Sequence, residues 1–339
     1  MITIDGAMGE GGGQVLRTSL ALSMVTGQPF RIERIRAGRS KPGLMRQHLT
    51  SVKAACAVCA GTAHGAELGS TTLDFVPGAI RGGEFSFAIG TAGSTTLVLQ
   101  TVLPALVTGA HPSTLTLSGG THNTYAPSVH FLEHAFLPLI QRMGPRVRLE
   151  LERHGFYPGG GGRIRVDIEP TTTLHPLELL DTPPITSRRA IATIAGLPES
   201  IARRELTVVR KKLGWPAECL RTDRLDDDLG PGNILSLEIT REDVTEVFTG
   251  FGERGVSAER VAARAVDDVQ RYLRAGVPVW RHLADQLMLP LAIAGTGAFT
   301  TGPLSRHATT NAEVIESFLS VRVHREHIKD DNWRVSFLG

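Results

Sequence analysis

The sequence predicts an α+β fold in which βαβαββ units are repeated and a further domain is inserted among them. An internal repeat and a local rise in charge density lead to this prediction. When the 339-residue chain is slid along itself by 82 residues, glycines and apolar positions coincide over two long segments. The coinciding positions are Gly11 with Gly93, Leu20 with Val102, Val25–Gly27 with Val107–Gly109, and Gly38 with Gly120.

Each copy begins with a glycine-rich loop, followed by a helix, a glycine turn and a strand that ends in glycine. A second helix is predicted over Pro42–Ala60 in the first copy and over Ser128–Met143 in the second. Alternating apolar residues then indicate strands, at 85–89 in one copy and at 164–168 in the other. A third copy at the C-terminus is marked by predicted helices near Leu283–Ala294 and Thr309–Leu319.

Charge density marks the insertion. From Ile185 to Ala275, 15 basic and 15 acidic residues occur among 91 positions, whereas the other 248 positions hold 40 charged residues. The flanking segments, rich in proline and glycine, are typical of domain boundaries. We therefore expect residues 185–275 to form the inserted domain, and residues 1–184 and 276–339 to form the repeat domain. The insert is predicted to contain strands at Ala190–Ala195 and Ile234–Ile239 and charged amphipathic helices at Pro198–Leu213 and Ser257–Leu273.

The overall composition is that of a globular protein, with 41% hydrophobic and 21% charged residues. The net charge of +2 is only a weak indication of a polyanionic partner. The N-terminus lacks the basic segment of a signal peptide, and the apolar stretch Leu287–Phe299 is too short to cross a bilayer. Three cysteines are too few for a disulfide scaffold, so we expect a reducing, cytoplasmic location without membrane attachment.

The first glycine-rich loop, Gly9–Gln14, leads into a helix and is a candidate anion-binding site. Glycines let a ligand approach the backbone closely, and a helix N-terminus favours negative charge. Gln14 and Arg17 share a face near that end. Glu10 is unexpected among phosphate-binding groups, unless it acts through a divalent cation that phosphate also coordinates. A tight turn with a solvated glutamate is an equally good interpretation.

A basic stretch follows, with seven basic residues and one acid between Arg31 and Lys53. Arginine side chains match phosphate geometry, so this stretch is a candidate phosphate-binding surface, although a solvated basic face is the default interpretation. The polar residues on or beside it are Arg36, Arg39, Arg46, Gln47 and His48.

Cys56 and Cys59 lie on the apolar face of the predicted helix, with Met45, Leu49 and Val52 at 4-3-4-3 spacing. This spacing favours core packing over a metal or redox site, which would need a second pair of ligands.

His307 comes just ahead of the last predicted helix, for which Thr310 and Glu313 form a capping-box pattern. A histidine at a helix N-terminus has a lowered pKa, which would keep it a neutral nucleophile. Most histidines are structural, so position alone is modest evidence. Asp285 and Gln286 are predicted in the first turn of the preceding helix, where either could simply be a cap.

Taken together, these segments resemble the RNA 3'-terminal phosphate cyclase family along almost the whole chain. No single segment is decisive, but the ordered set is highly specific. The segments are Asp5–Arg17, Ile35–His48, Gly93–Gln100, His154–Gly162, Leu229–Asn233, Leu283–Gln286 and the segment around His307.

The resemblance implies repeated βαβαββ units around a pseudo-threefold axis, as in enolpyruvyl transferases, with a smaller inserted thioredoxin-like domain. It implies that His307 is the adenylated nucleophile and that Glu10 binds metal. At His282 the family often has a tyrosine that packs on adenine, so nucleotide preference is less constrained here. By the same resemblance, the ATP pocket is formed by Gln100, Pro127, His282, Asp285 and Gln286, and the phosphates and RNA end are bound by Gln14, Arg17, Arg36, Arg39, Gln47 and His48.

The activity implied by the resemblance is ATP-dependent conversion of an RNA 3'-terminal phosphate into a 2',3'-cyclic phosphodiester. The expected intermediates are a covalent histidyl-AMP and an adenylated RNA end, and the expected cofactors are ATP with Mg²⁺ or Mn²⁺. Two alternatives stay open at this point. A non-catalytic cyclase-like scaffold of ribosome assembly would lack the nucleophilic histidine. An enolpyruvyl transferase would need neither ATP nor the basic stretch from Arg31 to Lys53.

Overall fold

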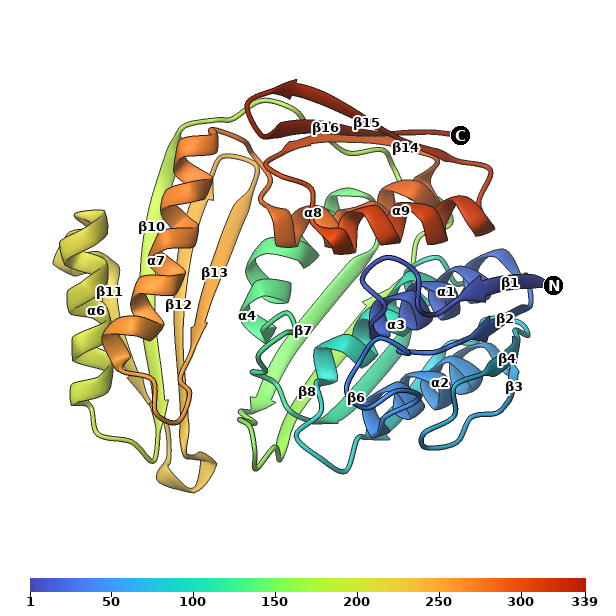
Figure 1. The fold of residues 1–339 in the computed structure, drawn as a ribbon, viewed down its shortest axis with the longest axis horizontal. Helices are drawn as coiled ribbons and strands as arrows, with labels where there is room; N and C mark the ends of the chain where they lie inside the picture. The colour runs from blue at the N-terminus through green and yellow to red at the C-terminus, as the bar shows by residue number, and fades with distance from the viewer.

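The computed structural model describes all 339 residues as an α+β protein with four separate four-stranded sheets, each mixing parallel and antiparallel pairs. Figure 1 shows three of these sheets gathered with their helices on one side of the molecule and the fourth set apart on the other.

The first unit contains a sheet with the order β1-β2-β4-β3, in which only β1 and β2 are parallel. Its elements are β1 (Ile2–Asp5), α1 (Gly13–Thr26), β2 (Phe30–Glu33), α2 (Arg46–Cys59), β3 (Thr62–His64) and β4 (Leu73–Val76). The second helix was predicted from Pro42, but it begins four residues later. Gly43 has a left-handed backbone (φ 76°) and donates to the Ile35 carbonyl, which holds this segment in a turn.

The second unit repeats the same topology with the order β5-β6-β8-β7. Its elements are β5 (Gly83–Ala88), α3 (Thr95–Val107), β6 (Ser113–Gly119), α4 (Val129–Phe131), η1 (Leu132–Phe136), α5 (Leu137–Arg142), β7 (Arg146–Arg153) and β8 (Gly162–Glu169). The single helix predicted over Ser128–Met143 is therefore three segments, of which η1 is a π-helical turn. Pro138 follows this turn and has no N–H to continue the regular ladder.

The third unit has the order β9-β14-β16-β15, again with its first pair parallel and the others antiparallel. Its elements are β9 (Glu178–Leu179), α8 (Arg281–Ala294), β14 (Thr296–Thr301), α9 (Arg306–Phe318), β15 (Arg322–Lys329) and β16 (Asn332–Leu338). The predicted βαβαββ order thus occurs three times, and the third copy is interrupted after its first strand.

The predicted capping box of the last helix was wrong. Helix α9 is capped by Ser305, whose hydroxyl accepts the Ala308 N–H at 2.9 Å. Thr310 therefore lies inside the helix and its hydroxyl donates to the Arg306 carbonyl at 2.7 Å. As a result His307 is the second residue of the helix rather than a residue ahead of it.

The fourth sheet has the order β11-β10-β12-β13, with two helices packed on it. Its elements are β10 (Ile185–Ala195), α6 (Ser200–Leu213), η2 (Ala217–Cys219), β11 (Leu220–Arg224), η3 (Asp227–Leu229), β12 (Gly232–Arg241), β13 (Thr245–Phe251) and α7 (Ala258–Ala275). This unit has a hydrophobic core of its own, centred on Tyr272 and including Trp215 and Trp280. In Figure 1 it lies at the left, beside the three repeated units.

The three repeated units share one large core, in which α1 packs against α3 and α9, and α8 packs against α9 (Figure 1). Cys59 is fully buried in this core and Cys56 packs against it, which confirms their interpretation as packing residues. Burial raises the pKa of Cys56 to about 11, so this thiol is unreactive at neutral pH. No helix has the length and apolar character needed to cross a membrane.

Candidate active site

The residues predicted to bind phosphate and metal line one cavity of about 790 Å³ between the first unit, the start of α3 and the start of α9. These residues are separated by up to 297 positions in the sequence, yet the fold brings them together. The predicted residues that line it are Glu10, Gln14, Arg17, Arg36, Arg39, Gln47, His48 and His307.

His307 projects into this cavity with one ring nitrogen already engaged. Its Nδ1 lies 2.8 Å from Gln14 Oε1 and 4.0 Å from Glu10 Oε2. Two acceptors on this side favour a proton on Nδ1, which leaves the lone pair on Nε2. Partial burial, followed by the charges of Arg17 and Arg39, lowers the pKa of His307 below its usual value. The ring is therefore a neutral imidazole at pH 7, and its side chain is 49% exposed.

Two glycines of the loop pack too closely against α9 and α2 to carry a side chain. Gly9 has φ 53°, and a Cβ there would lie 1.9 Å from Thr310 Oγ1, the atom that accepts the Glu10 N–H. A Cβ on Gly13 would lie 2.3 Å from His48 Nε2. Helix α1 starts after Gly12 with no side-chain cap and no acid in its first turn. Its positive N-terminal end is therefore available to an anion.

Glu10 is mostly buried, with 14% of its side chain exposed, and forms an ion pair with Arg39. It is thus not the solvated glutamate that one interpretation of the sequence required. Arg39 also lies near the Glu10 carbonyl, so the pair joins the glycine-rich loop to the basic loop. The Glu10 carboxylate lies beside His307 and several guanidinium groups. There it can stabilise a positive charge on the histidine ring, or it can bind a metal ion.

Four arginines line the cavity, and the three that were predicted to bind phosphate have different environments. Burial lowers the pKa of Arg17 to about 10, so it stays a cation at pH 7. Arg36 has a left-handed backbone (φ 55°), and its guanidinium donates to the carbonyls of Lys41 and Gly43 at 2.6 and 2.9 Å. Arg36 therefore braces its own loop while it lines the cavity, and Arg39 is engaged by Glu10.

His48 and Gln47 face the cavity from the first turn of α2. His48 Nδ1 accepts the Met45 N–H at 3.1 Å, so the ring carries its proton on Nε2, next to Gly13. Burial, and then the charges of Arg17 and Arg36, lower the pKa of His48 to about 3, which makes it a neutral donor. Gln47 Oε1 accepts the Ser94 N–H at 2.9 Å and joins α2 to the start of α3.

The residues predicted to bind ATP lie elsewhere, around α3 and α8, and none of them lines this cavity. Gln100 donates to Gln286 across these helices. The Pro127 carbonyl accepts from Thr96 Oγ1 at 2.8 Å, and His282 is exposed in the first turn of α8.

Asp285 is buried in the second turn of α8, so the interpretation of this residue as a helix cap was wrong. The helix begins after Trp280, whose N–H donates to Glu246 at 2.6 Å. Asp285 Oδ1 instead accepts from the Ser305 hydroxyl at 2.7 Å. Burial raises the pKa of Asp285 to about 7, although Ser305 and Arg281 act in the opposite direction.

Sequence reasoning missed several residues that position the histidine. Ser305 links Asp285 to the start of α9, and Asn311 accepts from Thr18 at 2.9 Å and donates to the Asp285 carbonyl at 3.3 Å. A serine one residue before a helical pattern was the available indication for Ser305. Nothing local could have indicated Asn311, because its partners are far away in sequence.

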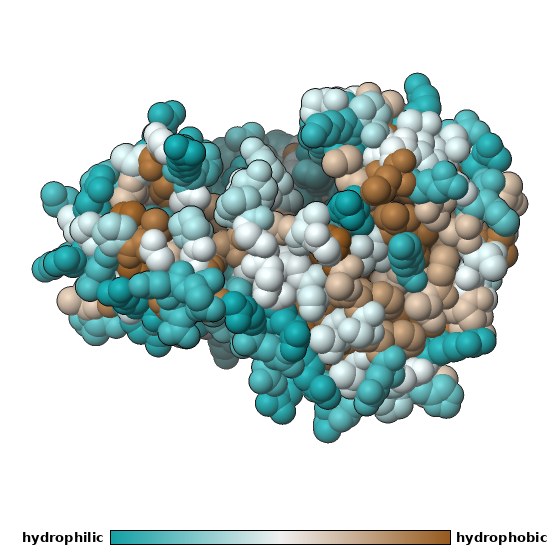
Figure 2. Space-filling view, turned by 90° about the horizontal axis from the view of Figure 1, so that it is seen from below, coloured by the Kyte–Doolittle hydropathy of each residue, from teal (hydrophilic) through white to brown (hydrophobic).

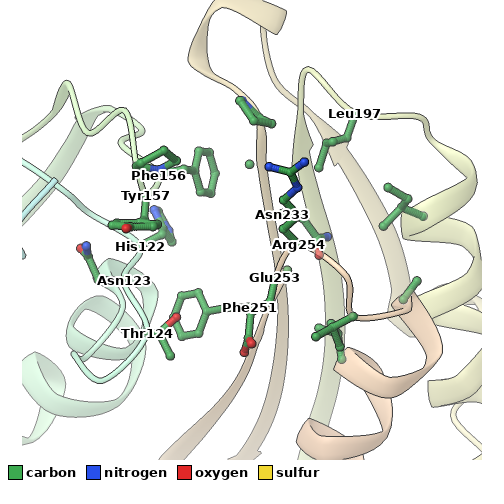
Figure 3. A pocket seen from close by; sticks show the side chains of 18 of the residues that line it. His122, Asn123, Thr124, Phe156, Tyr157, Leu197, Asn233, Phe251, Glu253 and Arg254 are labelled. Carbon is green, nitrogen blue, oxygen red and sulfur yellow. The ribbon is translucent and has the colours of Figure 1, made fainter.

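A second and larger cavity of about 1,090 Å³ lies between the second unit and the fourth sheet, and the sequence had not predicted it. Figure 3 shows aromatic side chains on one wall and Arg254 and Glu253 on the other. Tyr125 lines both cavities and is 98% exposed. Seen from below in Figure 2, hydrophilic side chains gather on the fourth-sheet side, and the surface is recessed between the two parts.

Comparisons with known proteins agree with the motifs. Residues 8–324 match the family model described as "RTC: RNA 3'-terminal phosphate cyclase". The chain is 52% identical to proteins named RNA 3'-terminal phosphate cyclase from Ectopseudomonas mendocina (95% of this chain and 94% of that one) and Pseudomonas fluorescens (97% and 96%). It is 53% identical to the one from Ralstonia nicotianae (95% and 92%).

Among solved structures, the enolpyruvyl transferase NikO from Streptomyces tendae is matched with a TM-score of 0.36 at 13% identity, over 96% of this chain and 46% of that one. The family resemblance predicted from the sequence is confirmed by the family model and the relatives. This chain belongs to the RNA 3'-terminal phosphate cyclase family.

Proposed function

We propose that this protein uses ATP to convert an RNA 3'-terminal phosphate into a 2',3'-cyclic phosphodiester, through a covalent adenylate on His307. One observation carries the proposal. The Nδ1 of His307 faces Gln14 and Glu10, so its Nε2 is left as a free nucleophile in a cavity lined by Arg17, Arg36 and Arg39. This arrangement also disfavours a non-catalytic scaffold, which has no use for a nucleophilic histidine.

In the first step, Nε2 of neutral His307 attacks the α-phosphorus of ATP, a P–N bond forms, and pyrophosphate leaves. The ring becomes positively charged as the bond forms, because Nδ1 keeps its proton. Gln14 accepts a hydrogen bond from that N–H, and the Glu10 carboxylate lies 4.0 Å away. Both groups are already in place before the charge develops, so they stabilise the transition state without reorganising.

Glu10 is the residue that would hold a divalent cation. A single buried carboxylate beside a phosphate cradle fits Mg²⁺ or Mn²⁺, which take one or two protein carboxylates and complete their shell with phosphate oxygens and water. Such an ion would supply charge neutralisation on the triphosphate. Arg39, which pairs with Glu10 in this structure, would then turn toward the phosphates.

In the second step, an oxygen of the RNA 3'-phosphate attacks the adenylate phosphorus, the P–N bond breaks, and His307 returns to its neutral form. In the third, the oxygen of the neighbouring 2'-hydroxyl attacks the 3'-phosphorus, its proton is lost to solvent, and AMP leaves. Arg17 and the Nε2–H of His48 are donors suited to hold the terminal phosphate near His307. Ring closure is intramolecular, so most of the rate increase can come from holding the RNA end in the reactive geometry.

We propose that adenine lies toward the residues around α3 and α8. The Gln100–Gln286 pair joins these two helices, and the Asp285–Ser305 hydrogen bond joins α8 to the helix that carries His307. His282 can stack on a base with less area than the tyrosine common in the family. The proposed ATP-binding residues are therefore unchanged: Gln100, Pro127, His282, Asp285 and Gln286.

We further propose two domains, a repeat domain of residues 1–184 and 276–339 and an insert of residues 185–275. The shared topology of the first three sheets supports an arrangement around a pseudo-threefold axis. The insert has a core of its own and runs as a βαβ unit followed by ββα, which supports a thioredoxin-like domain. We retain a cytoplasmic location as part of this proposal.

An RNA that ends in a 2'-deoxy-3'-phosphate tests the order of steps. The first two steps do not use the 2'-hydroxyl, so this RNA should be adenylated but should not cyclise, and a product heavier by one AMP should accumulate. The matched ribose substrate should yield the cyclic end, and an RNA ending in a 3'-hydroxyl should not react. Return of unmodified deoxy substrate, with no adenylated species at any time, would contradict the three-step scheme.

A further inference from the structure

Three histidines that the proposed reaction does not use meet in the second unit. His122 follows β6, His130 lies in α4, and His154 follows β7. One ring nitrogen of each lies within 4.8 Å of the others. The chain brings them together from three separate segments, so their meeting is a property of the fold and not of one motif.

One pair of ring nitrogens is already at the separation expected around a bound metal. His122 Nε2 lies 3.3 Å from His130 Nδ1, and two imidazole nitrogens bound to one tetrahedral Zn²⁺ at about 2.05 Å would be about 3.3 Å apart. The His122 and His154 rings are stacked with centroids 5.1 Å apart and planes 11° apart. A metal lies in the plane of each imidazole that binds it, so His154 would have to turn out of this stacked arrangement to complete a three-nitrogen site.

The ring of His122 is oriented by Thr121, which is not one of the three histidines. This residue is 2% exposed, and its Nδ1 lies 2.8 Å from the Thr121 hydroxyl oxygen. That oxygen already accepts the Gly155 N–H at 2.9 Å, and the hydroxyl can donate to the Gly155 carbonyl at 3.4 Å. When the hydroxyl donates to the Gly155 carbonyl, its oxygen can also accept the His122 Nδ1–H, which leaves the Nε2 lone pair free. Metal-binding histidines are usually held in this way through their second nitrogen.

The tautomer of His122 also suits a metal. With its proton on Nδ1, the His122 Nε2 lone pair is directed at His130 Nδ1, 3.3 Å away. Without a metal, a single N–H···N hydrogen bond between them is the alternative arrangement.

We propose that His122, His130 and His154 bind one Zn²⁺ ion, with a fourth position open to water from the larger cavity. Imidazole nitrogens suit Zn²⁺ rather than Mg²⁺, so this site is chemically separate from Glu10. His122 lines the larger cavity beside Phe156 and Tyr157 (Figure 3). The ion would fix the turn after β6, the start of α4 and the β7–β8 loop to one another at that wall.

Direct metal binding by the full-length protein tests this proposal. After removal of bound metal with a chelator, the protein is titrated with Co²⁺, whose visible absorption reports tetrahedral nitrogen coordination, and then with Zn²⁺. We expect one equivalent of tightly bound Zn²⁺ and an increase in thermal stability on binding. His130→Ala and His154→Ala should each weaken binding by more than about tenfold. These two residues are only partly buried, so both variants should fold, which circular dichroism checks.

His134→Ala is the matched control. Its ring lies 6.0 Å from that of His130, but its Nδ1 contacts Glu238 of the fourth sheet at 3.0 Å. This variant should keep the Zn²⁺ affinity and the Co²⁺ spectrum of the unmodified protein. The proposal is overturned if the unmodified protein binds no Zn²⁺ at micromolar concentration, or if His130→Ala and His154→Ala bind it as tightly as the unmodified protein does.

Discussion

The two cavities of this protein are built in opposite ways. The smaller one is lined by charged and amide side chains whose positions are fixed by hydrogen bonds, and it contains His307, the proposed nucleophile. The larger one lies between two separate hydrophobic cores and is lined by aromatic rings, with arginines and a glutamate opposite. Under the proposed function, bond formation takes place where the side chains are held by hydrogen bonds. The upstream part of a long RNA substrate would need only a surface to bind to, because no bond is made or broken there.

Tyr125 joins the two cavities, since it lines both of them and is almost fully exposed. Aromatic rings bind single-stranded RNA by stacking on its bases. We therefore expect the nucleotides upstream of the reacting end to pass over Tyr125 toward the larger cavity. The predictions below test this separation of chemistry from chain binding, beginning with the largest effect.

His307→Ala should abolish covalent attachment of AMP, with loss of more than about 10³-fold in the rate of self-adenylation, because the nucleophile is missing. The measurement is transfer of label from α-labelled ATP to the protein with a divalent metal, followed by denaturing electrophoresis. His324→Ala, which changes an exposed histidine on β15, is the control and should be labelled normally. Robust labelling of His307→Ala would assign the adenylate to another residue.

Glu10→Gln should slow self-adenylation by about 30-fold or more and should raise the Mg²⁺ or Mn²⁺ concentration needed for half-maximal rate. Charge neutralisation by a metal is worth several kcal/mol, and 1.36 kcal/mol is a factor of ten in rate. Metal titrations of the adenylation rate measure both effects. A variant with the metal dependence of the unmodified protein would indicate that Glu10 serves only to pair with Arg39.

Tyr125→Ala should raise the KM for an RNA 3'-phosphate by about 5- to 160-fold, since stacking of one base is worth roughly 1–3 kcal/mol. Self-adenylation does not involve RNA, so its rate should be unchanged. Tyr125→Phe keeps the ring and should restore the KM. If Tyr125→Ala binds oligonucleotides and a mononucleotide 3'-phosphate as the unmodified protein does, the RNA does not follow this route.

Arg17→Met should move the acid limb of the self-adenylation pH profile to higher pH. Arg17 is one of the causes that lower the pKa of His307, so its removal lets that pKa rise toward the ordinary value. The nucleophile is then protonated, and inactive, at a higher pH than before. The shift should be small, because partial burial and Arg39 remain. Arg46→Met is the control, since Arg46 lines the cavity but is not among those causes. An equal shift in both variants would indicate a general charge effect.

The sequence by itself determined much of the first cavity and of the fold. The βαβαββ order and the core role of Cys56 and Cys59 follow from local spacing and residue type, whereas the roles of Glu10 and His307 were implied only by the family resemblance. Such features depend on near neighbours in the chain, which a linear pattern displays. Predicted element limits failed where a specific hydrogen bond set them, as at Gly43 and at Ser305.

Only the tertiary structure decided which groups face one another. Gln14 was predicted to bind phosphate, yet it also holds His307, which is 293 residues away in the chain. Likewise Asp285 is bound to Ser305, and the cluster of His122, His130 and His154 forms from three segments that share no motif. Contacts of this kind depend on how sheets and helices pack, and residue spacing along the chain carries no information about that packing.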